Sequence, residues 1–284
     1  MNGLQQMVHA RGGLDKLPVR LRRTLSMYVA LESQNIPRKD DKSNRSIRID
    51  LFHATTWDFP PRFPFIRPQE DFSMPLKALP SLSENDLRFL KAYEKSSSKW
   101  SMYGMLQVLR ILTAVRFSGP LTVFNRLALS DAIYLLEYQL LSPQPCLEPE
   151  LINATGFQEA FRLAVFLYID KVLRQMPPLN VKGLVSRLIG ALKSISPSRH
   201  AETSMHPHLG VLLWMIMIGR INAYKVDDMQ YFLGELVVVY GHLNFEEIID
   251  FQRYLDEVGP VLQPYKLQCE EILTQIEKFS HIQL

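Results

Sequence analysis

The sequence predicts an all-α protein, an irregular bundle of about ten helices interrupted by one long proline-rich loop. Apolar residues recur at intervals of three and four through most of the chain, which is the spacing of one buried helix face. No stretch shows the sustained alternation of apolar and polar residues that is typical of a half-buried strand. Glycines, prolines and capping residues then divide the apolar stretches into segments of helix length.

The composition is that of a globular protein with a large core. The chain has 284 residues, of which 47% are hydrophobic and 21% charged, and it is predicted to form a single helical domain over residues 1–284. A formal net charge of +3 without a sustained basic tract does not indicate nucleic-acid binding.

The most apolar run, residues 209–218, reaches only about half the length of a bilayer span and predicts a core helix. Cys146 and Cys269 match no metal-ligand spacing and are interpreted as reduced thiols, with a disulfide as the alternative.

The N-terminal segment is predicted to be a short helix, a double-glycine turn and a longer helix. Residues 4–8 carry the apolar face of the short helix, and Gly12 and Gly13 end it because glycine adopts positive φ at no steric cost. Pro18 suits the first turn of the longer helix, where its missing N–H is not needed. Three arginines outside the apolar stripe favour a solvated surface over phosphate contact: Arg20, Arg22 and Arg23.

Residues 36–82 contain seven prolines and are predicted to be a long irregular excursion, because so many prolines exclude a continuous helix or a central strand. Five aromatic residues in this excursion favour an extended segment lying on the helical body, with a partner-binding motif as the alternative: Phe52, Trp57, Phe59, Phe63 and Phe65.

From Ser83 onward, start and stop signals delimit the predicted helices. Five caps or capping boxes open helices: Ser83 with Asp86, Thr155 with Gln158, Asn180, Asp227, and Asn244 with Glu247. Glycines and prolines end them, at Gly119-Pro120, Pro143, Pro177-Pro178, Pro197 and Gly259-Pro260. The clearest segments that result are 100–117, 121–141, 209–223 and 229–240.

Signatures of catalysis are absent from the sequence. It contains no G-x-S-x-G elbow, no Walker-type phosphate loop, no H-E-x-x-H and no G-x-G-x-x-G. We therefore predict no catalytic residue, no cofactor and no metal.

Three groups of residues could suggest a site, and each has a simpler interpretation. A solvated loop is favoured over a zinc site for His200, His206 and His208. Adjacent helical residues point about 100° apart, so acidic pairs are poorly placed to share one substrate: Asp227-Asp228, Glu246-Glu247 and Glu270-Glu271. Core packing is favoured over an effector pocket for Met205, Met215, Met217 and Met229.

The N-terminal segment LQQMVHARGGLDKL…LRRTLSMYVALES resembles the fungal-specific transcription factor domain, the helical regulatory region that in many fungal proteins follows a zinc binuclear cluster. The resemblance rests on a signature turn made by Arg11, Gly12, Gly13, Leu14, Arg22 and Arg23. Four later segments resemble the same family in the same order: LSENDLRFL (82–90), LLEYQLLS (135–142), FRLAVFLYIDKVLRQMPP (161–178) and HPHLGVLLWMIMIGRINA (206–223).

The resemblance implies a nuclear transcriptional regulator that acts through contacts with the transcription machinery or co-regulator proteins. A homodimer and a small-molecule effector are compatible with it, and no membrane association is expected. The six-cysteine cluster of the family does not occur here, so DNA contact is expected only indirectly or through a zinc cluster missing from the N-terminus of this chain. The alternative is a helical scaffold or adaptor with no transcriptional role. An enzyme with an unrecognised site is the third hypothesis.

Overall fold

The computed structural model describes seven stretches of the chain, residues 82–95, 101–141, 154–175, 181–195, 208–243, 248–260 and 262–280. These residues are 90% helical and contain nine α-helices, one π-helix and no strand, which confirms the all-α prediction. The predicted N-terminal helices and residues 36–81 of the proline-rich excursion lie outside the described residues.

The helices of the described residues follow one another along the chain. They are α5 (Glu84–Lys95), α6 (Met102–Phe117), α7 (Val123–Leu141), α8 (Ala154–Tyr168), the π-helix η2 (Ile169–Leu173), α9 (Val181–Ile195), α11 (Leu209–Asn222), α12 (Val226–Leu243), α13 (Ile248–Val258) and α14 (Leu262–Ser280). Of the predicted segments, 209–223 agrees with α11 to within one residue. The segment 229–240 falls inside the longer α12.

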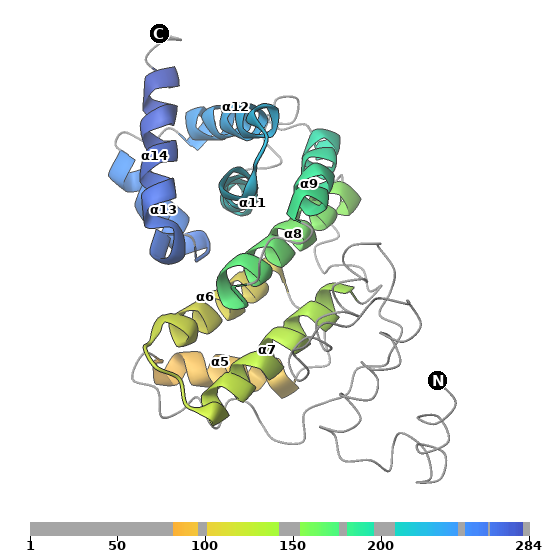
Figure 1. Ribbon diagram of the computed structural model, residues 1–284, viewed down its shortest axis with the longest axis vertical. Coiled ribbons are helices and arrows are strands. Elements are labelled where there is room, and N and C mark those ends of the chain that lie inside the picture. Colours follow the sequence, from red (N-terminus) through yellow and green to blue (C-terminus); the bar gives the residue numbers. More distant parts are fainter. Residues whose placement is uncertain are drawn as a thin grey trace, which may run out of the picture.

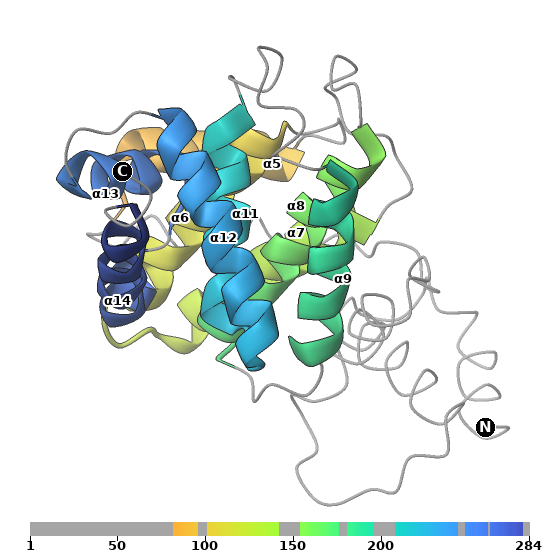
Figure 2. The ribbon, with the colours of Figure 1, turned by 90° about the horizontal axis from the view of Figure 1, so that it is seen from above.

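The helices form two groups with α8 running between them. Figure 1 shows α5, α6 and α7 at one end and α9 with α11 to α14 at the other. α8 packs against both α9 and α11, so it connects the groups. Seen from above, α11 and α12 lie side by side between α14 and α9 (Figure 2). Arg110 of α6 adds a further link, because its guanidinium donates to the carbonyl oxygens of Asp256 and Glu257 at the end of α13.

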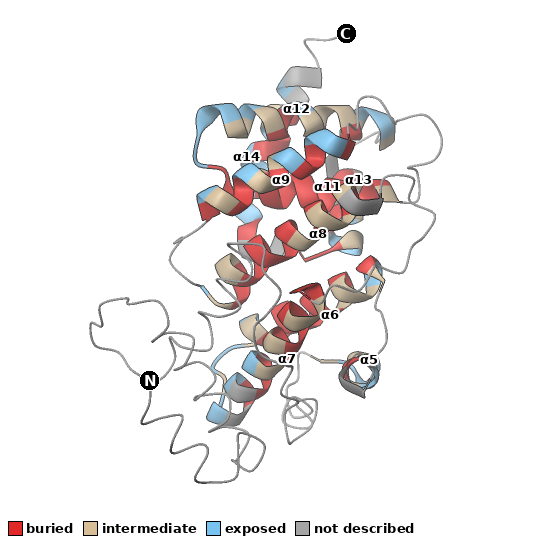
Figure 3. Cartoon of the chain, turned by 90° about the vertical axis from the view of Figure 1, so that its right-hand side faces the viewer, coloured by how far each residue is buried: buried red, intermediate tan, exposed pale blue. Residues whose placement is uncertain are grey.

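The core is centred on α11, which is apolar on all sides. Every residue from Leu209 to Gly219 is buried, and Trp214 is fully buried. Figure 3 shows the buried positions facing inward, with exposed positions on the outer sides of α5, α9 and α12. A helix that is hydrophobic all round must be surrounded by other helices. The predicted core helix is therefore confirmed.

Helix ends agree with the predicted capping in one clear case. Ser83 and Asp86 form the predicted capping box, in which each backbone N–H donates to the side chain of the other at 3.1 Å. Ser101 caps α6 by accepting from the Gly104 N–H at 3.1 Å, so α6 begins just after the predicted start at Trp100. Gly119 then follows α6 with a φ of 112°, a conformation that favours glycine.

Two predicted caps are wrong. α8 begins at Ala154 and α12 at Val226, so Thr155 and Asp227 each lie inside the first turn of a helix. At Asp227 the reason is electrostatic, because an acidic residue also stabilises the first turn by facing the positive end of the helix dipole. The predicted caps Asn180 and Asn244, with Glu247, lie outside the described residues.

Candidate functional site

The signature turn of the resemblance lies outside the described residues. This applies to Arg11, Gly12, Gly13, Leu14, Arg22 and Arg23 and to the aromatic residues of the excursion. The structure instead brings residues of the four later segments into one buried core, and contacts between three of these segments lie at the end of α8.

The π-helix η2 places a buried ion pair at this point. Arg174 follows η2, and its backbone N–H donates to the Ile169 carbonyl at 2.9 Å, a bond that spans five residues. The Arg174 guanidinium pairs with the Glu137 carboxylate of α7, and the two side chains are 10% and 3% exposed. Asp170, one turn earlier, lies 3.9 Å from the same guanidinium. π-helical turns are rare and occur frequently at functional sites.

The residue after Arg174 has an unusual backbone conformation. Gln175 has a φ of 51°, in the left-handed region that few residues other than glycine adopt. Its side-chain oxygen accepts a hydrogen bond of 2.6 Å from Arg116 of α6. The helix therefore ends at a left-handed turn before Pro177, and we call Arg116, Glu137, Asp170, Arg174 and Gln175 the polar junction.

An aromatic cluster lies on the core side of the junction. The Tyr168 hydroxyl is 2.8 Å from the Thr113 hydroxyl of α6, and both residues are buried. Burial raises the pKa of Tyr168, so its hydroxyl stays protonated. The rings of Tyr168 and Phe161 lie 6.0 and 6.2 Å from that of Trp214 in α11. These contacts join α6, α8 and α11.

The printed contacts connect three of the four later segments of the resemblance, 135–142, 161–178 and 206–223. Tyr93, in α5 just beyond the segment 82–90, donates to Gln139 of α7. Glu137 in the same segment pairs with Arg174, and Tyr168 contacts Trp214. Three segments that are separate in the sequence are thus connected, and Leu90 of the fourth lies in the same buried core. Because the junction pairs a buried carboxylate with a guanidinium, it suits the positioning of helices better than proton transfer.

The described histidine and cysteine that the sequence singled out do not form a reactive group with the polar junction. Among the described residues, no three His, Cys, Asp or Glu side chains are arranged to hold a metal ion. His208 lies at the start of α11 with its ring 5.9 Å from that of Phe157, whereas His200 and His206 lie outside the described residues. Cys269 is a free, buried thiol, and burial raises its pKa to about 12.

The described residues also include some of the predicted core methionines and acidic pairs. Met215 and Met217 are fully buried in α11, which agrees with core packing. Asp227 and Asp228 lie in the first turn of α12, and Glu270 and Glu271 are exposed on α14. Met229 packs against the core, while Met205, Glu246 and Glu247 lie outside the described residues.

Sequence reasoning missed the polar junction. Glu137 is the only charged residue in the segment LLEYQLLS, and a charge within an apolar stretch is the signal that could have marked it as buried. Its partner Arg174 lies 37 residues away and could not be identified from local spacing.

None of the helices in the described stretches is long and apolar enough to cross a bilayer. Searches for known relatives found no matching family model, no matching curated protein and no matching solved structure.

Proposed function

We propose that this chain is a nuclear transcriptional regulator of the fungal type, which acts through protein contacts and not through DNA-binding residues of its own. The observation that carries the proposal is the ordered resemblance of five segments, from the signature turn to residue 223, to the fungal-specific transcription factor domain. The regulated step is recruitment of the transcription machinery or of a co-regulator. A homodimer and a bound effector are compatible with this role.

The contacts within the described residues support the proposal. Three segments that resembled one family only as separate stretches of sequence are joined by Glu137 with Arg174 and by Tyr168 with Trp214. A regulatory domain needs a rigid helical body that presents surfaces to partners. The buried ion pair and aromatic cluster fix the helices of such a body relative to one another.

A tethering experiment tests the proposal. The full chain is fused to a heterologous DNA-binding domain in a fungal reporter strain, and the reporter transcript is measured. We expect the transcript to rise or fall relative to the DNA-binding domain alone. The matched control is the same fusion carrying Lys91→Glu, a substitution at an exposed position of α5. An unchanged transcript, together with cytoplasmic residence of the tagged chain, would instead support the scaffold or adaptor.

A further inference from the structure

We draw no further inference here: the strongest candidate, the buried side-chain pair of Asn222 in α11 and Tyr265 in α14, carries none, because the two polar groups neighbour each other and nothing in the described residues shows a ligand that would meet them.

Discussion

Two helix contacts in this protein are held in different ways. α7 meets the end of α8 through the ion pair between Glu137 and Arg174, which is nearly closed to solvent. α11 meets α12 where Gly219 lies against the ring of Phe232, and both residues are buried. The first contact depends on attraction between charged groups. The second depends on the absence of a side chain. Similarly buried contacts in one helical protein can therefore differ in which substitutions they tolerate.

The largest expected effect comes from removing one charge of the ion pair. Arg174→Met takes away the cation that pairs with a carboxylate of which only 3% is exposed. We expect the free energy of unfolding to fall by about 3–5 kcal/mol, because a buried charge loses its partner. Chemical denaturation followed by circular dichroism measures the change.

The double variant Glu137→Leu/Arg174→Met is the matched control. Replacing both charges with apolar side chains should restore most of the lost stability. A double variant as unstable as the single one would mean that the shape of this contact matters more than its charge.

The next effect comes from adding a methyl group between α11 and α12. A Cβ on Gly219 would overlap the Phe232 ring, whose Cδ1 would lie 2.9 Å away and two other ring atoms closer still. We expect Gly219→Ala to reduce the free energy of unfolding by about 1–3 kcal/mol through overpacking. Thermal melting of the variant beside the parent protein gives the difference.

Gly234→Ala provides the control for this substitution. Gly234 lies on α12 with no atom within 4 Å of the added Cβ. Because alanine favours the helix over glycine, we expect a gain of up to about 1 kcal/mol. If both alanine variants gained stability, close approach at Gly219 would not be what holds α11 to α12.

A smaller effect is expected at Tyr168, which contacts both groups of helices. Tyr168→Phe keeps the ring against Trp214 but removes the hydroxyl that lies 2.8 Å from Thr113. We expect a loss of about 1 kcal/mol, the typical worth of one hydrogen bond. A double-mutant cycle with Thr113→Val measures the coupling. Full additivity of the two losses would show that the hydroxyl pair contributes nothing to joining the groups.

The smallest effect is a dependence of stability on pH through Glu235 of α12. Burial raises the pKa of Glu235 above its ordinary value of 4.5. The stability that its protonated form contributes is therefore complete below pH 4.5 and is lost as pH rises through the raised pKa. Glu235→Gln stays neutral, so its melting temperature should exceed that of the parent protein at pH 7.

The size of this pH effect should be modest, because the side chain is only half-buried and solvent screens it. Melting both proteins at pH 4 and pH 7 verifies the sign. If the melting temperatures of the two proteins differed equally at pH 4 and pH 7, the effect would come from side-chain shape and not from ionisation.

Local signals in the sequence predicted most helices for physical reasons that act over a few residues. Ser83 and Asp86 satisfy each other within one turn, so their spacing was enough to place the start of α5. The capping signal was less accurate at Thr155 and Asp227, since residues that favour a cap also occur within the first turn.

The polar junction was not predicted from the sequence. The segments containing Glu137, Arg174 and Trp214 were singled out only for their resemblance to one family, and no local pattern marked these residues as contacts. The π-helix was not predicted either, because one added residue in a helical turn leaves the apolar spacing of the flanking α-helix almost unchanged.

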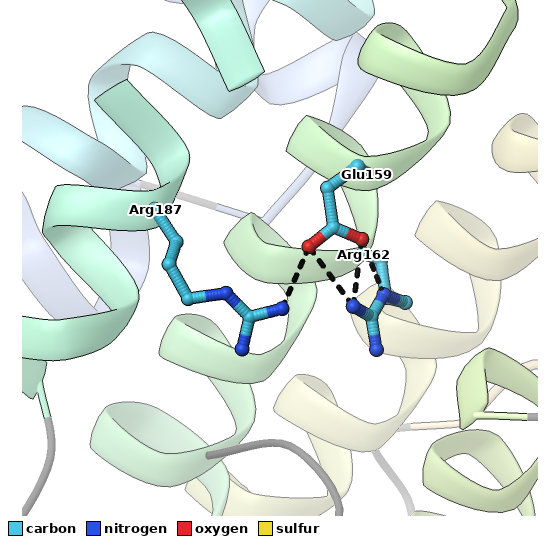
Figure 4. A network of polar contacts seen from close by, with 3 residues as sticks. All are labelled: Glu159, Arg162 and Arg187. Carbon is cyan, nitrogen blue, oxygen red and sulfur yellow. Dashed lines mark hydrogen bonds and ion pairs between the residues drawn. The ribbon is translucent and has the colours of Figure 1, made fainter. Parts of the chain in front are cut away.

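The sequence by itself determined that this protein is helical, where α6, α7, α9 and α11 lie along the chain, and that α11 is a core helix. These properties follow from apolar spacing and helix ends, which depend on neighbours within a turn. Only the tertiary structure decided that Glu137 pairs with Arg174, that the Phe232 ring packs directly against Gly219, and that two arginines share Glu159 (Figure 4). Such pairs depend on how helices distant in sequence pack against one another, and local periodicity carries no information about that choice.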